Sequence, residues 1–346
     1  MIWNSWVLAL IIGQVGIVAV NAVAFINALR IIRNWDPTSY DPEQLELERR
    51  SELVATIVTW SLLFEVFSLV VFERTTDSLA PFIPGAMCPV GVLGQNPWGY
   101  PTLFVKMFGL FVYGFWIVLN WVDIRVEGFP LTPFKSRYTL VLFPYLMLDV
   151  TLQVIFFSKL DPSVITSCCG VVFEVGGQSY ASSVASLPPK ITRWILASYG
   201  VGFLLVSWLL HWERRKWGRT LHALLSAGGF FLGMAAVIAF TAPYIYQMPA
   251  LHCPFCLMKR ENYYYGYLVY APLFIATFFG VCPALLDPLR RSYRAAVEVM
   301  EGAQMRMVRV SRAFWLVFLI MAFLPMGYYL WQSGGVDLFI GGRFVF

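Results

Sequence analysis

The sequence has 346 residues, of which 59% are hydrophobic and only 13% are charged. Soluble domains usually contain about 25% charged residues, so a surplus of apolar side chains this large does not fit one soluble core. Lipid can cover it, because a membrane-spanning helix needs about 20 mostly apolar residues. The net charge of +5 does not indicate nucleic acid as a partner, since the basic residues lie in short clusters beside apolar segments. The composition predicts an integral membrane protein that contacts the lipid bilayer.

Apolar segments of membrane-spanning length recur along the chain and predict an all-α fold, a polytopic membrane helix bundle of about eight transmembrane helices. The expected spans lie near residues 5–29, 54–73, 102–123, 138–158, 193–212, 221–246, 264–286 and 313–332. The first segment has no basic residue ahead of it and is too long for the apolar part of a signal peptide, so we expect a retained helix. Asp41-Pro42-Glu43 is typical of a helix start, and this helix is expected to run into the second span.

The connections between spans predict the orientation of the chain. Those after the first, third, fifth and seventh spans contain most of the 25 Lys and Arg residues. Basic residues accumulate on the cytoplasmic side of membranes. We therefore expect both termini outside the cytoplasm, with a bacterial inner membrane as the location.

A short motif occurs twice, each time ahead of an expected span. It reads Cys88-Pro89 followed by Gly99-Tyr100 and the third span, and Cys253-Pro254 followed by Gly266-Tyr267 at the start of the seventh. Four helices separate the two copies. The chain is therefore either a single transmembrane domain, residues 1–346, with a chance similarity, or a duplicated four-helix unit with halves 1–160 and 161–346.

Most of the cysteines fall in connections on the predicted outer face. These residues are Cys88, Cys168, Cys169, Cys253 and Cys256. Thiols in an oxidising compartment form disulfides, bind metal or take part in redox chemistry, so all of these cysteines are candidates for structural disulfides. The remaining Cys282 lies within a span and is expected to be a small buried hydrophobic residue.

The sharpest local motif is His252-Cys253-Pro254-Phe255-Cys256. Proline suits the first position of a helix, which would place Cys253 at the N-cap and Cys256 one turn inside. Unpaired backbone N–H groups and the positive end of the helix dipole would stabilise thiolates there. Such a pair is suited to thiol–disulfide exchange.

This motif at the outer end of a transmembrane helix resembles the vitamin K epoxide reductase and disulfide-bond-formation family of membrane oxidoreductases. The resemblance implies that Cys253 and Cys256 are a catalytic pair beside a quinone and that Cys168 or Cys169 is a catalytic shuttle cysteine. The adjacent Cys168-Cys169 departs from the spaced loop pair of that family, and the family core has fewer helices than this chain. We therefore expect membrane electron transfer of the thiol–disulfide type with quinone as cofactor.

The aromatic run near the seventh span permits two interpretations. Tyr264 and Tyr267 could stack against the quinone, or the run could be an ordinary aromatic belt at the membrane surface.

Two further functions remain open from the residues themselves. Structural disulfides could hold the outer loops of a noncatalytic membrane subunit, which would dock an extracytoplasmic redox protein or cytochrome. Alternatively, His252, Cys253 and Cys256 could ligate a metal in a metal-handling transporter, because CxxC supplies half of a tetrahedral thiolate site.

Several ionisable residues lie within or beside the expected spans. Glu65 and Asp149 fall near the middle of the second and fourth spans, and Lys106 in the third could pair with either. Because a charge in hydrocarbon is costly, we expect Glu65 and Asp149 to face the protein interior. They could form a static ion pair or a protonated carboxyl group bonded to a neighbouring helix, or a proton or quinone site. His211 and His222 flank one short connection and could be ordinary interfacial residues or ligands of a haem b.

Overall fold

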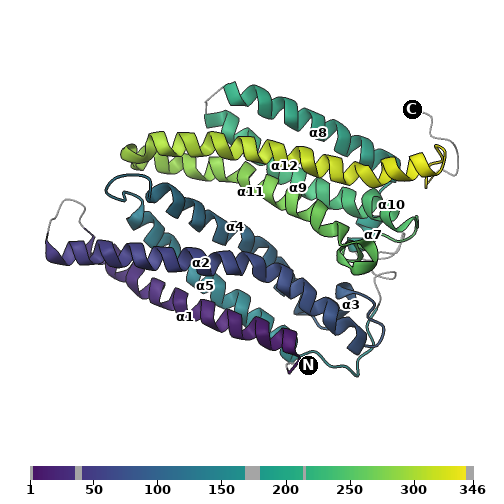
Figure 1. Ribbon diagram of the computed structural model, residues 1–346, viewed down its shortest axis with the longest axis horizontal. Coiled ribbons are helices and arrows are strands. Elements are labelled where there is room, and N and C mark those ends of the chain that lie inside the picture. Colours follow the sequence, from purple (N-terminus) through teal and green to yellow (C-terminus); the bar gives the residue numbers. More distant parts are fainter. Residues whose placement is uncertain (1–2, 36–40, 168–179, 213–215, 340–346) are drawn as a thin grey trace. The chain divides into compact units, whose positions relative to one another are not determined.

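The computed structural model describes residues 3–35, 41–167, 180–212 and 216–339, leaving out the side chains of 180–182, 210–212 and 216. These residues form helices and connecting segments, without a strand (Figure 1). Eight of the helices are long and apolar enough to cross a membrane. The prediction of an all-α, polytopic membrane helix bundle is confirmed.

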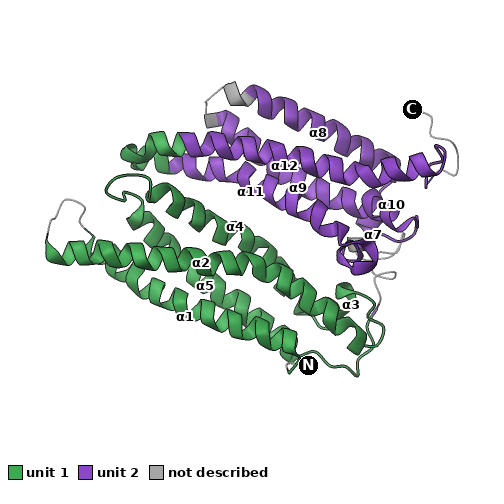
Figure 2. Cartoon of the chain, in the orientation of Figure 1, with its two compact units in different colours: residues 1–166, 289–301 green, residues 167–288, 302–346 purple. Residues whose placement is uncertain are grey.

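The chain divides into two compact units (Figure 2). Unit 1 consists of residues 1–166 and 289–301, and unit 2 consists of residues 167–288 and 302–346. The boundary near residue 166 lies close to the one expected for a duplication, but the duplication itself stays a prediction.

Unit 1 contains four long helices in a closed ring. The helices are α1 (Ser5–Asn34), α2 (Pro42–Leu79), α4 (Gly99–Asp123) and α5 (Thr132–Ser158). Helix α1 contacts α2 and α5, and α4 also contacts α2 and α5, so every helix has two neighbours in the ring. Apolar side chains from all four helices form the core, including Ala24, Leu62, Trp116 and Leu146.

The start of α2 follows the sequence pattern. Asp41 is the N-cap residue, and Pro42 occupies the first turn, where its missing N–H would have no intrahelical partner in any case. The helix continues without a break to Leu79. The expected cytoplasmic helix and the second span are therefore one element, as predicted.

A compact connection joins α2 to α4. It contains the one-turn 3₁₀ helix η1 (Ala80–Phe82) and the short helix α3 (Pro89–Leu93). Cys88 is the N-cap residue of α3 and is fully buried. The segment after α5 holds this connection, since the Thr166 amide donates to the Pro84 carbonyl at 3.0 Å and its hydroxyl donates to Gly91 O at 2.9 Å.

Unit 2 contains the other four long helices. Its elements are α7 (Tyr180–Ala185), α8 (Pro189–Trp212), α9 (Lys216–Ala236), η2 (Val237–Thr241), α10 (Ala242–Tyr246), η3 (Cys256–Met258), η4 (Arg260–Asn262), α11 (Tyr265–Ser292) and α12 (Val297–Gln332). The end of α11, the 3₁₀ helix η5 (Arg294–Ala296) and the start of α12 belong to unit 1. The core joins all four spans through Phe203 of α8, Phe240 of η2, Leu273 of α11 and Trp315 of α12. Cys282 is 1% exposed, which agrees with its expected role as a buried hydrophobic residue.

The sixth span is one continuous helical rod with a π-helical turn. Helix α9 passes through η2 into α10. A π-helical turn shifts the backbone hydrogen-bond pairing and is frequent at functional sites. Here it lies directly against the segment that contains Cys253 and Cys256, as described next.

Candidate functional site

The Cys253–Cys256 segment lies between α10 and α11 and forms a tight loop. Cys256 begins the one-turn helix η3, whose N-cap residue is Phe255. The long helix α11 begins only at Tyr265. The prediction of a helix starting at Pro254 is therefore wrong: the backbone turns through η3 and η4 first, so no long-helix dipole points at these thiols.

The loop nevertheless brings the two sulfur atoms together. Cys253 and Cys256 are both thiols, and their Sγ atoms lie within 4.8 Å of each other. Cys253 is fully buried, whereas Cys256 is partly exposed. A small side-chain movement would bring the sulfur atoms to bonding distance, which is about 2.0 Å in a disulfide.

Three side chains fix the backbone of this loop. The Tyr246 hydroxyl donates to the Cys253 carbonyl at 2.6 Å, the Tyr270 hydroxyl to Pro254 O at 2.9 Å, and the Asn262 amide to Cys256 O at 2.8 Å. These residues come from α10, α11 and η4. Because each anchor binds backbone and not sulfur, the thiols can react while the loop keeps its shape.

His252 is an anchor and not part of a ligand set with the thiols. It is 2% exposed, and its Nδ1 lies 2.9 Å from the carbonyl oxygen of Ile238 in η2. A carbonyl only accepts, so Nδ1 donates the hydrogen. In the part of the chain that the structure describes, His252 does not join Cys253 and Cys256 in a group of potential metal ligands.

The tyrosines near this loop have distinct positions. Tyr264, expected beside a quinone, is 40% exposed and adopts a left-handed backbone conformation with φ of 57°. Tyr267 is partly buried in the first turn of α11. Tyr270 anchors the loop through the hydrogen bond from its hydroxyl to Pro254 O, a role that sequence reasoning did not assign. The signal was its place in α11, but finding it required knowing where that helix begins.

The other predicted cysteines divide between described and undescribed parts of the chain. Cys168 and Cys169 lie outside the described residues, so their role as shuttle cysteines stays a prediction. Cys88 is a thiol at the N-cap of α3 in unit 1. His222 is 1% exposed and stacks near Phe203, with ring centroids 5.1 Å apart, whereas the side chain of His211 lies outside the described residues.

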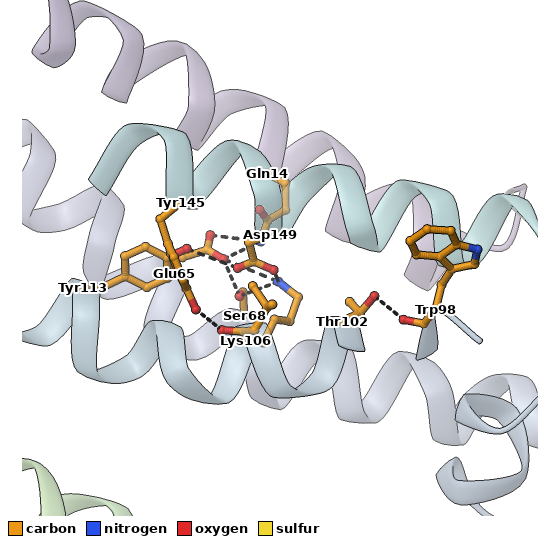
Figure 3. A network of polar contacts seen from close by, with 10 residues as sticks. Gln14, Glu65, Ser68, Trp98, Thr102, Lys106, Tyr113, Tyr145 and Asp149 are labelled. Atoms are coloured by element: carbon orange, nitrogen blue, oxygen red, sulfur yellow. Dashed lines mark hydrogen bonds and ion pairs between the residues drawn. The ribbon is translucent and has the colours of Figure 1, made fainter. Parts of the chain in front are cut away.

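Glu65, Lys106 and Asp149 meet in the middle of unit 1 (Figure 3). The Lys106 Nζ atom lies 3.1 Å from Asp149 Oδ1 and 3.5 Å from Glu65 Oε1. None of the three residues is more than 2% exposed. The expectation that Glu65 and Asp149 face the protein interior agrees with the structure, and Lys106 contacts both carboxyl groups.

Neutral side chains complete this network, which we call the buried charge network (Gln14, Glu65, Ser68, Lys106, Tyr113 and Asp149). The Gln14 amide donates to both Glu65 oxygens at 2.8 and 2.9 Å, and the Ser68 hydroxyl donates to Glu65 Oε1 at 2.9 Å. The Tyr113 hydroxyl donates to Asp149 Oδ2 at 3.2 Å. All four long helices of unit 1 thus contribute to one site.

A second buried ion pair of unit 1 lies at the C-terminal end of α4. Lys135 Nζ contacts Asp123 Oδ2 at 2.8 Å and donates to Asn120 Oδ1 at 2.9 Å. Asp123 also accepts from the Leu131 amide and the Thr132 hydroxyl. This pair contains one charge of each sign and several hydrogen bonds, which is the arrangement of a static structural ion pair.

Comparison with known proteins adds no relative: no family model, no curated protein and no solved structure matches the chain. The fold defines the class as an integral membrane helix bundle. Function must therefore be argued from the two sites.

Proposed function

We propose that the chain is a membrane thiol–disulfide oxidoreductase in which Cys253 and Cys256 are the redox pair and a quinone is the electron acceptor. The observation on which this depends is the pair of thiols within 4.8 Å of each other in a loop anchored by Tyr246, Tyr270 and Asn262. Such a site is suited to redox chemistry, because the two sulfur atoms are close and the loop backbone is already held in place.

The proposed step is balanced. The two thiols lose two electrons and two protons and form one S–S bond, and the quinone gains both and becomes a quinol. In the other half of the cycle, the disulfide accepts two electrons and two protons from a dithiol partner outside the cytoplasm. An extracytoplasmic redox protein could supply that dithiol, and Cys168 or Cys169 could relay the exchange within the chain as a shuttle cysteine through a mixed disulfide.

The exposure of the two thiols assigns their roles in exchange with a partner. Exchange proceeds through a mixed disulfide, and its rate depends on access. Because Cys256 is partly exposed and Cys253 is fully buried, a partner thiol forms the mixed disulfide with Cys256 and releases Cys253, and the partner's second thiol completes the exchange. In the reverse direction, Cys256 attacks the disulfide of an oxidised partner and Cys253 resolves the mixed disulfide. Cys253→Ser should then trap the partner covalently on Cys256, whereas Cys256→Ser should trap nothing.

The environment of the loop follows from the charge pattern. The connections on the opposite side of the membrane contain most of the basic residues, which supports a position of the loop outside the cytoplasm. A bacterial inner membrane supplies quinone within the bilayer and an oxidising outer compartment. Tyr264, immediately before α11, and Tyr267, in its first turn, are the proposed aromatic contacts of the quinone ring.

The test is a redox titration of the full chain in lipid nanodiscs, followed by alkylation and mass spectrometry. Cys253 and Cys256 should become protected together when a soluble quinone is added and reactive again after mild reductant. Cys282, buried within α11, is the internal control and should not change with quinone. A reduction potential above about −300 mV would distinguish the pair from a structural disulfide.

Two other outcomes would contradict the proposal. A disulfide that resists mild reductant throughout would make the pair a structural staple of a noncatalytic subunit. Thiols that resist alkylation until a chelator is added, with metal copurifying, would indicate a metal site in which ligation replaces redox chemistry.

A further inference from the structure

The buried charge network of unit 1 has an unequal number of opposite charges. Glu65 and Asp149 supply two carboxyl groups, and Lys106 is the only cation that acts on Asp149 among the described residues. The remaining groups that face the network are Gln14 from α1, Ser68 from α2, Tyr113 and Tyr145. With all three charged groups ionised, the network would have one negative charge in excess.

An excess charge at this depth is costly. Glu65 and Asp149 are 2% and 0% exposed, and each uncompensated charge in a membrane interior costs several kcal/mol. The two carboxyl groups also share one site, because both contact the same Lys106 Nζ atom, at 3.5 Å for Glu65 and 3.1 Å for Asp149. Carboxyl groups that share a site avoid double ionisation by holding a proton between them.

We propose that Glu65 and Asp149, together with Lys106, form an intramembrane proton-binding site that takes up and releases one proton. With the proton bound, the network is electrically neutral. Without it, the hydrogen bonds from Gln14, Ser68 and Tyr113 partly stabilise the negative charge. This site lies in unit 1 and does not depend on the thiol chemistry proposed for unit 2.

A polar stripe on α4 connects the network to one end of unit 1. At helical spacing, its buried side chains are Thr102, Lys106, Tyr113, Trp116, Asn120 and Asp123. Trp116 donates to the Thr139 hydroxyl at 2.9 Å, and Asn120 donates to the Thr59 hydroxyl at 3.0 Å. Asn120 and Thr59 line a groove of about 470 Å³. The stripe supplies hydrogen-bonding groups from this groove to the proton site.

A further polar side chain lies on the opposite side of the network. Gln153, one turn beyond Asp149 on α5, is 0% exposed, and neither atom of its amide has a hydrogen-bond partner within the described part of the chain. Buried amides are normally hydrogen-bonded. The Gln153 amide could therefore donate to, and accept from, a bound water that takes part in proton exchange.

The test is infrared difference spectroscopy of the full chain in lipid between acidic and alkaline pH. The wild type should show a carboxylic-acid C=O band that shifts in D₂O and persists at neutral pH, where exposed carboxyl groups are ionised. Glu65→Gln and Asp149→Asn should each abolish it, because the remaining carboxylate then balances Lys106 one to one. Asp123→Asn is the matched control and should keep the band.

Two results would overturn the proposal. One is a wild-type spectrum with no such band at neutral pH, a measurement that needs no variant to fold. The other is a band that persists in the double variant Glu65→Gln/Asp149→Asn, since the proton would then lie elsewhere.

The route has its own test in the rate at which the bound proton exchanges with D₂O. Thr139→Val, between the groove and the network, should slow exchange about tenfold, the factor expected for the loss of one hydrogen bond. Thr102→Val, on the other side of Lys106, should leave the rate unchanged. A slowing confined to Thr102→Val would refute access from the groove.

Discussion

Both units contain the same short Cys-Pro motif before a span, but the residue at its fourth position differs. Cys88-Pro89-Val90-Gly91 in unit 1 matches Cys253-Pro254-Phe255-Cys256 in unit 2. The second thiol of unit 2 is replaced by Gly91 in unit 1. A Cβ atom on Gly91 would lie 2.7 Å from the Ala86 Cα atom, so the backbone leaves no room for a side chain there. Unit 1 is thus unsuited to a CxxC pair by its packing.

The glycine of the motif has the same role in both units. In each, it lies at the start of a span, against the preceding short helical segment. A Cβ on Gly99 would lie 2.1 Å from Leu93 O, and one on Gly266 would lie 2.6 Å from Met258 Cγ. Both spans therefore begin at a close approach that only glycine permits.

Within the spans, it is unit 1 that has the reactive or charged residue and unit 2 that has the inert one. Lys106 and Leu273 lie equally far along the chain from Gly99 and Gly266. Lys106 belongs to the buried charge network, whereas Leu273 is part of the apolar core of unit 2. The comparison teaches that a similar order of elements accommodates a pair of thiols at the end of one unit and a group of buried charges in the middle of the other.

The largest expected effect comes from giving unit 1 the residue of unit 2, by Lys106→Leu. Removing the Lys106 ammonium group leaves two buried carboxyl groups uncompensated. Loss of one partner of a buried ion pair destabilises a protein by about 3–5 kcal/mol. The apparent Tm of the purified protein in detergent should fall strongly.

The control for Lys106→Leu removes the charges altogether. The triple variant Glu65→Gln/Lys106→Leu/Asp149→Asn should recover much of the lost stability, since neutral replacement of a buried ion network is often tolerated. A triple variant less stable than Lys106→Leu would show that the loss came from packing and not from charge.

A smaller effect is expected from Gly91→Cys, which writes the CxxC of unit 2 into unit 1. The new side chain would meet Ala86 backbone at 2.7 Å, and overpacking of this kind costs about 1–3 kcal/mol. Gly91→Ala should cost a similar amount, because the Cβ alone makes the clash. Gly16→Ala, where the structure leaves open space, should be neutral or stabilising. Gly91→Cys at full stability, with a disulfide to Cys88, would remove the packing distinction between the units.

The long spans and the burial of Glu65 and Asp149 could be predicted from sequence because lipid imposes them. Apolar length fixes a span, and the cost of a charge in hydrocarbon fixes which way a carboxyl group points. The sequence indicated only that Lys106 could pair with one carboxyl group or the other. Its contact with both depends on how the helices are rotated against each other.

The cysteine loop shows where such reasoning ends. Proline after Cys253 is compatible with a helix start, but the chain instead forms two one-turn helices before α11. Tyr263 and Tyr264 both adopt left-handed conformations at this point, which no propensity of tyrosine indicates. The anchors Tyr246, Asn262 and Tyr270 were missed for the same reason: side chain to backbone contacts across a loop have no sequence period.

The smallest expected effect tests whether those anchors tune the thiols, through Tyr270→Phe. The change removes one hydrogen bond, from the Tyr270 hydroxyl to Pro254 O, and should cost about 0.5–1.5 kcal/mol. Tyr265→Phe is the matched control. Tyr265 also lies in α11, and its hydroxyl donates to the Met321 carbonyl of α12 at 2.8 Å. Both variants should lose a similar amount of stability.

Only Tyr270→Phe should also change the redox equilibrium of Cys253 and Cys256. The Tyr270 bond holds the loop in the dithiol geometry of the structure, so losing it destabilises the reduced form and makes the reduction potential more negative. A shift of up to about 30 mV corresponds to the loss of one hydrogen bond, since about 30 mV equals 1.4 kcal/mol for two electrons. The measurement is a titration against a glutathione buffer with alkylation as the readout. Equal potentials in both variants would mean that Tyr270 supports the fold of unit 2 without tuning its thiols.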